Sequence, residues 1–381
     1  MIVELHMIQN FAPSCLNRDD TNSPKECQFG GYRRARISSQ CIKRAIREEF
    51  KNSLDWPPEY MATRSRLFVD KLADKLTSRG KNLDEAQVAA AKTLQSMGLG
   101  VNNGQSEYLL YLGEKELTSI AETVLERWQE FDSLAIDTSD KGGEKKATKK
   151  ASNLGEALKQ LLDGGKAADL ALFGRMLADL PEKNVDAACQ VAHAISTHKV
   201  GVEFDFYTAV DDLQPKQEAG AGMMGTVEFN SACYYRYANV NLVQLRENLG
   251  GDEELSLKTV GAFIRASVSA IPTGKQTSMA APNPPEFIMA VVRDFGVWSL
   301  ANAFARPVWP GSNGSLVGQS ISALVNYWNR LVKVYGNSGI QAVPALAVGE
   351  ADLSTFTPVE NIDKLVEEVL QALRLPSQKG A

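Results

Sequence analysis

A dense cluster of cationic side chains lies near the N-terminus of an otherwise acidic chain. The 381-residue sequence carries a net charge of −5 at pH 7. Six side chains between positions 33 and 47 are positive and none is negative, so a net charge of −11 remains for the other residues. Charge separated in this way predicts one surface that binds a polyanion. The six residues are Arg33, Arg34, Arg36, Lys43, Arg44 and Arg47.

The pattern around these cations predicts a helix from about residue 40 to residue 50. Ser38 or Ser39 suits the N-cap position. Steps of about 100° per residue place the polar side chains of this helix opposite its apolar side chains, Ile42, Ala45 and Ile46. Unpaired N–H groups and the positive end of the dipole at the helix start favour phosphate oxygens. An ordinary solvated face of an amphipathic helix explains the same spacing. The polar set is Gln40, Lys43, Arg44 and Arg47.

Residues just upstream carry further features typical of nucleic-acid binding. Phe29-Gly30-Gly31 is an aromatic residue followed by a turn where a backbone can approach a ligand closely. Tyr32 next to two arginines resembles the aromatic and cationic mixture of single-strand binding grooves. A polar loop, Asn17-Arg18-Asp19-Asp20, follows a predicted first strand at 2–9.

Together these motifs closely resemble the CasC family, the backbone subunit of the type I-E CRISPR surveillance complex called Cascade. The N-terminal match consists of LNRDD, Lys25, FGG and RRARISSQCIKRAIR. Further matches follow in order along most of the chain: FGRM at 173–176, QVAHAISTHKV at 190–200, DFYTAVDDLQ at 205–214, GTVEF at 225–229, YYRYANVNLVQLRENLGG at 234–251 and NPPEF at 283–287.

The element pattern predicts an α+β fold with a helical middle. Strands are expected at 2–9, 227–242 and 287–294, and helices near 67–76, 85–97, 114–131, 255–271, 320–335 and 358–374. A hydrophilic stretch at 140–150 is predicted to be a mobile loop. The resemblance implies an RRM-like (ferredoxin-like) palm at 1–55, 186–200 and 226–381, a large helical fingers insertion at 56–185 and a hairpin-like thumb at 201–225.

The resemblance also implies a mechanism and a set of partners. Several copies would stack head to tail along CRISPR RNA in a helical filament with other Cascade subunits, leaving the guide free to pair with target DNA. The residues that match backbone-contacting positions are Arg18, Lys25, Ser38, Gln40, Lys43 and Arg47. Those that match base-flanking positions are Met176, Tyr207, Thr208 and Met224. A second basic group, Lys145, Lys146, Lys149 and Lys150, is expected either to touch duplex DNA or to form a solvated linker.

The sequence carries little that indicates an enzyme. It has no P-loop, GxSxG or Rossmann motif, and His6, His193 and His198 are expected to be buried or structural. We therefore expect no catalysis and no cofactor or metal. One alternative is a metal-dependent RNA endonuclease using Asp19-Asp20 or Asp211-Asp212, although these pairs also suit turn capping and ion pairs. A third hypothesis is an oligomerising scaffold with no role in nucleic-acid binding.

Composition places the chain among cytoplasmic globular proteins. Five scattered cysteines without CxxC spacing favour reduced thiols over a disulfide framework or a zinc site. Neither a signal peptide nor a membrane-spanning stretch is evident, so a membrane partner is not expected.

Overall fold

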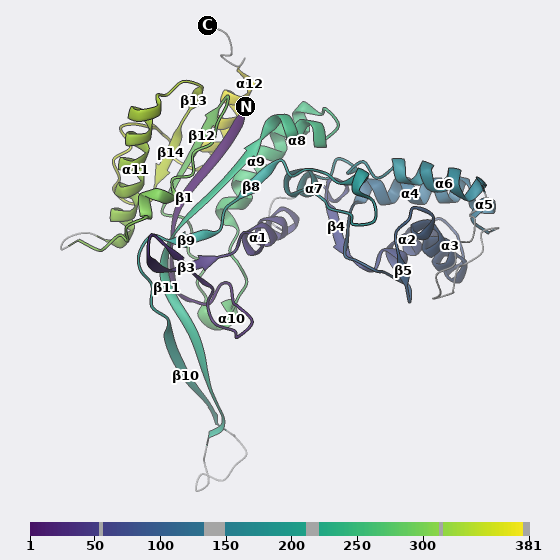
Figure 1. Cartoon of the computed structure of the whole chain (residues 1–381), viewed down its shortest axis with the longest axis horizontal. Helices are drawn as coiled ribbons and strands as arrows, with labels where there is room; N and C mark the ends of the chain where they lie inside the picture. Colours follow the sequence, from purple (N-terminus) through teal and green to yellow (C-terminus); the bar gives the residue numbers. More distant parts are fainter. Residues whose placement is uncertain (53–55, 133–148, 211–220, 312–314, 376–381) are drawn as a thin grey trace. The chain divides into compact units, whose positions relative to one another are not determined.

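The computed structural model describes residues 1–52, 56–132, 149–210, 221–311 and 315–375. The chain divides into two compact units (Figure 1). The first unit comprises Met1–Leu54, Cys189–Leu242 and Leu257–Ala381, and the second comprises Asp55–Ala188 and Val243–Ser256. A mixed α/β fold is therefore confirmed, with most of the strands in the first unit.

A large, mainly antiparallel sheet forms the centre of the first unit. Strand β1 (Ile2–Ser14) pairs with β11 (Ala221–Asn241) on one side and with β12 (Phe287–Arg293) on the other. The order is β15-β14-β12-β1-β11-β9-β3-β2, and β8 and β10 also pair with β11 while β13 pairs with β12. The remaining strands are β2 (Glu26–Phe29), β3 (Tyr32–Ile37), β8 (Cys189–Val191), β9 (Ala194–Ser196), β10 (Glu203–Val210), β13 (Ile340–Ala342), β14 (Pro344–Ala347) and β15 (Thr357–Pro358).

Both faces of the sheet are buried at its central strand, β1. Ile8 and Tyr235 pack with Trp328 of α11 (Leu316–Tyr335), which covers one face. Leu5 and Met7 have opposite parity to Ile8 in the strand and are also buried, so the other face is covered as well. Helix α12 (Ile362–Arg374) contacts β12 and β14. The other helical segments of this unit are α1 (Ser39–Asn52), most of α9 (Glu253–Ser269), α10 (Gln276–Met279) and η3 (Ala301–Phe304).

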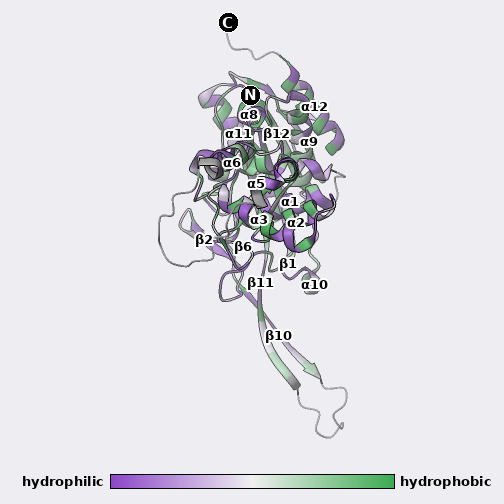
Figure 2. Cartoon of the chain, turned by 90° about the vertical axis from the view of Figure 1, so that its right-hand side faces the viewer, coloured by the Kyte–Doolittle hydropathy of each residue, from purple (hydrophilic) through white to green (hydrophobic). Residues whose placement is uncertain are grey.

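Strand β10 and residues 221–229 of β11 form a two-stranded ribbon that extends beyond the rest of the sheet (Figure 1). Thr208 lies opposite Met224, and Tyr207 lies opposite Gly225. Phe204 and Phe206 are each about two-thirds exposed, at 66% and 65%. Hydrophobic residues along β10 are also visible in Figure 2. Of the thumb expected at 201–225, residues 211–220 lie outside the described residues, and residues 221–225 belong to β11.

The second unit is mainly helical, with its own apolar core. Leu76, Leu94, Ile120 and Leu158 from four helices meet in this core. Its elements are η1 (Pro58–Tyr60), β4 (Ala62–Ser65), α2 (Phe68–Thr77), α3 (Leu83–Ser96), β5 (Val101–Asn102), β6 (Gln105–Ser106), β7 (Leu110–Gly113), α4 (Glu114–Glu126), α5 (Trp128–Asp132), α6 (Lys149–Gln160), α7 (Ala168–Phe173) and η2 (Pro181–Lys183). Helix α8 (Leu242–Asn248) also lies here, except for its first residue.

One helix predicted from the sequence is broken in the structure. The pattern at 114–131 predicts a single helix, but α4 ends at Glu126 and α5 begins at Trp128. Arg127 between them has φ −108° and ψ 27°, outside the α-helical region, which is why the helix stops. None of the helices in the described ranges is both long and apolar enough to cross a bilayer.

Candidate nucleic-acid interface

Helix α1 forms where the sequence predicts it and presents its polar side to solvent. Ser38 is the N-cap, because its Oγ accepts a hydrogen bond from the Cys41 amide at 3.4 Å. Ile42, Ile46 and Phe50 are buried against the first unit. On the polar side, Gln40 and Arg44 are exposed, and Lys43 and Arg47 are partly exposed. The side chain of Ser38 is thus directed into its own helix start, and the residue is only 6% exposed.

The polar loop after β1 is docked onto the start of α1. Asn17 Oδ1 accepts the Ser38 amide at 2.8 Å, and the carbonyl of Asn17 accepts the Lys25 amide at 2.8 Å. The Lys25 carbonyl in turn accepts the Arg36 amide at 2.9 Å. These bonds bring Lys25, a predicted RNA contact, next to the beginning of the basic helix.

Asp19 organises the tip of the same loop. Its Oδ1 accepts hydrogen bonds from the Thr21 hydroxyl at 2.8 Å, the Thr21 amide at 2.9 Å and the Ser23 amide at 3.0 Å. The hydrogen bond from the Thr21 side chain is the main reason that the pKa of Asp19 is lowered. This geometry is the turn capping that the sequence allowed as one reading of the aspartate pair.

His193 is an exposed member of this surface, which the sequence did not indicate. Its Nδ1 lies 3.3 Å from the Ser39 amide and 3.2 Å from Arg36 Nη1. Both neighbours are donors, so Nδ1 must be the acceptor and the neutral ring carries its proton on Nε2. Partial desolvation and the positive charges of Arg36 and Lys25 lower the pKa of His193. Of the two environments expected for the histidines, buried or structural, His193 has the second: it is exposed, but it accepts the Ser39 amide at the start of α1.

The other two histidines have structural environments. His6 is fully buried, and its Nδ1 lies 3.0 Å from the Tyr235 hydroxyl. His198 accepts the Cys233 amide on Nε2 at 3.2 Å, and its Nδ1 lies 2.9 Å from the Lys199 carbonyl, to which it donates.

One arginine of the basic cluster is not at the surface. Arg34 is fully buried and donates to the carbonyl oxygens of Ser196 at 3.0 Å and Phe304 at 2.6 Å. Its neighbour Arg33 is 58% exposed in its side chain and forms an ion pair with Glu26. Strand geometry explains the difference, because consecutive side chains point to opposite faces. The cationic surface is therefore smaller than the count of six charges predicts.

A groove of about 690 Å³ lies beside α1, between the 16–22 loop and residues 271–274. Arg18 and Arg44 line it, but so do Asp19, Glu48 and Glu49. Charges of both signs therefore meet in this groove. Arg44 and Arg18 contribute to it, whereas Lys43, Arg47 and Lys25 are not among its lining residues.

The ribbon carries three of the predicted base-flanking residues. Tyr207 is 39% exposed, Met224 is 66% exposed, and Thr208 is the cross-strand partner of Met224. Strand alternation places Phe204 and Phe206 on the same face as Thr208, and the sequence reasoning missed both. Their alternation with Glu203 and Asp205 could have indicated a strand with one apolar face.

The remaining predicted residues lie elsewhere. Met176 belongs to the second unit and is 81% exposed. Lys149 and Lys150 begin α6, whereas Lys145, Lys146 and the pair Asp211-Asp212 lie outside the described residues. Within the ranges that the structure describes, no three His, Cys, Asp or Glu side chains are grouped so that they could hold a metal ion.

Comparison with known proteins relates the whole chain to one group of assemblies. The family model described as CT1975-like protein matches residues 3–369. A chain in a solved structure titled "CRISPR RNA-guided surveillance complex, pre-nicking" is 32% identical, with a TM-score of 0.83, and the match covers 97% of this chain and 100% of that one. A chain in a second structure, titled "CRISPR RNA-guided surveillance complex", is 28% identical, with a TM-score of 0.72 and coverage of 96% and 99%. Comparison with curated proteins found no match.

Proposed function

Because this chain belongs to the family of CT1975-like proteins, we propose that it is an RNA-binding backbone subunit of a type I-E Cascade complex. In this proposal the sheet of the first unit is an RRM-like palm, the second unit is the fingers insertion and the ribbon is the thumb. The similarity to chains of two CRISPR RNA-guided surveillance complexes supports a role in such an assembly.

The observation that carries the proposal is the polar side of α1. A capped helix start presents Gln40 to solvent, with Lys43 and Arg47 one and two turns further along. Amide, ammonium and guanidinium donors at this spacing suit successive phosphate oxygens. Lys25, Arg36 and His193 add donors next to the same helix start. In this proposal these donors contact phosphates only, and sequence recognition is left to the guide.

The base-flanking role is assigned to apolar side chains. Met176, Tyr207 and Met224 are exposed, and with Thr208 they would lie against bases turned out of the stack at intervals. Copies of the chain would follow one another along CRISPR RNA, each contacting the next, while the intervening bases pair with target DNA.

We also propose that the subunit is not an enzyme. The Asp19 carboxylate accepts hydrogen bonds from Thr21 and Ser23, which supports a structural role in ordering the polar loop after β1. A cleavage assay with matched target RNA and Mg²⁺ tests this. Product formation that disappears in Asp19→Ala would establish the endonuclease alternative instead.

Salt dependence of RNA binding provides the decisive test. The double variant Lys43→Gln/Arg47→Gln should bind single-stranded RNA more weakly. The plot of log association constant against log salt concentration should also become shallower: the magnitude of its negative slope should decrease by about 1.4, because each lost phosphate contact contributes about 0.7. The control Arg330→Gln/Lys333→Gln removes two exposed cations from α11. It should leave both affinity and slope unchanged.

Two results would contradict the proposal. An unchanged slope in the α1 double variant would exclude this helix as the phosphate-binding face. A purified protein whose absorbance ratio at 260 and 280 nm shows no nucleic acid, and which also fails to bind added RNA, would favour the oligomerising scaffold.

A further inference from the structure

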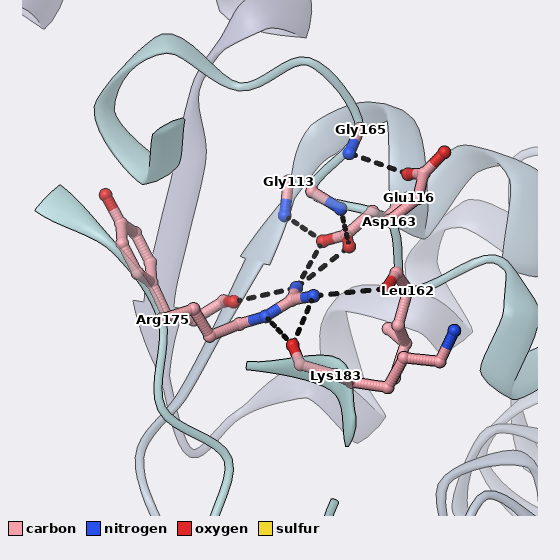
Figure 3. Close-up of polar contacts among 9 residues, drawn as sticks. Gly113, Glu116, Leu162, Asp163, Gly165, Arg175 and Lys183 are labelled. Carbon is pink, nitrogen blue, oxygen red and sulfur yellow. Dashed lines mark hydrogen bonds and ion pairs between the residues drawn. The ribbon is translucent and has the colours of Figure 1, made fainter. Parts of the chain in front are cut away.

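A completely buried ion pair lies in the second unit. The side chains of Glu116, in the first turn of α4, and Arg175 are both 0% exposed. Arg175 Nη1 donates to Oε1 of Glu116 at 2.8 Å and to Oε2 at 2.9 Å (Figure 3). Burying two charges is unfavourable unless their remaining hydrogen-bonding capacity is also satisfied.

The surrounding backbone satisfies both charged groups. Glu116 also accepts the amides of Gly113 at 2.7 Å and Gly164 at 2.6 Å. Arg175 Nη2 donates to the carbonyl oxygens of Leu162 and Lys183, both at 3.2 Å (Figure 3). The pair therefore joins the start of α4, the 162–164 segment and η2 to the loop that contains Arg175.

The next residue, Met176, is 81% exposed although both of its neighbours are buried. Counted over the whole residue, backbone included, Arg175 is 4% exposed and Leu177 is 3% exposed. The backbone is held on either side of Met176. Arg175 and Val185 exchange two backbone hydrogen bonds of 2.9 Å, and the Leu177 amide donates to Asn184 Oδ1 at 2.6 Å.

Gly174 allows this loop to leave α7. Its φ is +76°, and a Cβ there would lie 2.7 Å from the Val185 carbonyl oxygen, closer than real Cβ contacts come. Only glycine meets both conditions without strain. The FGRM segment thus combines a glycine turn, a buried arginine anchor and an exposed methionine.

We propose that Glu116 and Arg175 are positioning residues that fix the backbone of Met176, so that its thioether side chain is held ready to insert between bases of bound RNA. The inference rests on the proposed RNA-binding function. Insertion orders both the side chain of Met176 and the backbone that carries it, and each loses conformational entropy. Because the backbone is already ordered in the free protein, only the side-chain entropy is lost in the binding step.

The test uses the full-length protein and RNA that contains 2-aminopurine, a base whose fluorescence rises when it is unstacked. Wild-type protein should increase the fluorescence at regularly spaced positions, and Met176→Ala should abolish the increase. In Glu116→Gln the increase should be at least threefold smaller, whereas the dissociation constant should stay within twofold, because phosphate contacts dominate affinity.

The matched control is Glu114→Gln, on the same helix two residues away. Glu114 forms ion pairs with Lys71 at 2.7 Å and Lys75 at 2.5 Å, and the hydrogen bonds of the Arg175 guanidinium do not involve it. This variant loses ion pairs in the same unit but should retain the wild-type fluorescence increase. Equal loss in Glu114→Gln and Glu116→Gln would show a general structural effect and overturn the proposal.

Arg175→Lys provides a second variant if Glu116→Gln does not fold, because it keeps the charge but loses the forked donor geometry. A wild-type fluorescence increase in either folded variant overturns the proposal. Hydrogen exchange in the wild-type protein needs no variant: the Arg175 and Leu177 amides should be strongly protected, and rapid exchange at both overturns it. Absence of RNA binding by the wild type would instead contradict the proposed function, while the exchange result still reports on the anchored loop.

Discussion

The Arg34 guanidinium donates to the backbone carbonyl of Phe304 at 2.6 Å, a contact between residues 270 positions apart. A second donor of the same group reaches the Ser196 carbonyl at 3.0 Å. Burial lowers the pKa of Arg34, since desolvation disfavours its charged form. An arginine in the most basic segment of the sequence therefore joins parts of the first unit.

This contact predicts opposite consequences for two adjacent arginines. Arg34→Met should reduce the free energy of unfolding by about 3 kcal/mol, because it leaves two buried carbonyl groups unpaired. Arg33→Met removes only a partly exposed ion pair with Glu26. It should change the free energy of unfolding by less than about 1 kcal/mol. Urea unfolding of both variants measures the difference. Similar values for the two would contradict the structural role of Arg34.

His6 should make stability depend on pH in the acidic range. Burial, with a smaller contribution from Arg293, lowers the pKa of His6 to about 3. The unfolded chain binds this proton near pH 6.5, so the stabilising contribution is complete above that pH and declines as the pH falls from about 6.5 toward 3. Between pH 7 and pH 5 the loss from this group is about 2 kcal/mol.

Chemical unfolding at both pH values, in the wild type and in His6→Gln, isolates that contribution. The variant should be less stable at pH 7 but should lose about 2 kcal/mol less on acidification than the wild type. Identical pH dependence in the two proteins would show that His6 does not account for the effect.

Neighbouring glycines in the β2–β3 turn should differ in their tolerance of a side chain. Gly30 has φ +62°, and a Cβ there would lie 1.7 Å from the carbonyl oxygen of Ala305. Gly31 has φ +83°, with nothing within 4 Å of the corresponding position. Gly31→Ala should lower the free energy of unfolding by about 1 kcal/mol, because alanine disfavours the left-handed backbone conformation. Gly30→Ala should lower it by at least about 2 kcal/mol more, because the backbone at Ala305 must also move to make room for the new methyl group. Thermal unfolding compares them, and equal losses would contradict the close approach.

The lysine group at 145–150 remains a prediction for contact with duplex DNA. Reversing the charges of Lys145, Lys146, Lys149 and Lys150 should weaken non-specific duplex binding by the assembled complex, most strongly at low salt. A control reverses four cations on α11 and α12: Arg330, Lys333, Lys364 and Arg374. Unchanged duplex binding, or an equal loss in the control, would favour the solvated linker.

Local patterns in the sequence predicted much of the secondary structure. The predicted strand at 287–294 is found at Phe287–Arg293, and the helix predicted at 40–50 is found at Ser39–Asn52. The family resemblance drawn from the N-terminal motif is also confirmed. The prediction of a single helix at 114–131 was wrong at Arg127, where the helix is interrupted although no glycine or proline in the sequence indicates a break.

The sequence by itself determined the family, the amphipathic helix and the position of the cationic cluster, because these depend on residue types at short spacings. Only the tertiary structure decided which of those charges reach solvent. Arg33 and Arg34 are adjacent and chemically identical, but one lies at the surface and the other under Ser196 and Phe304. In the same way, His193 accepts a hydrogen bond from Ser39 at the start of α1, 154 positions away in the sequence. Arg175 pairs with Glu116, which is 59 positions away. Burial and pairing depend on segments distant in the chain, which no local pattern encodes.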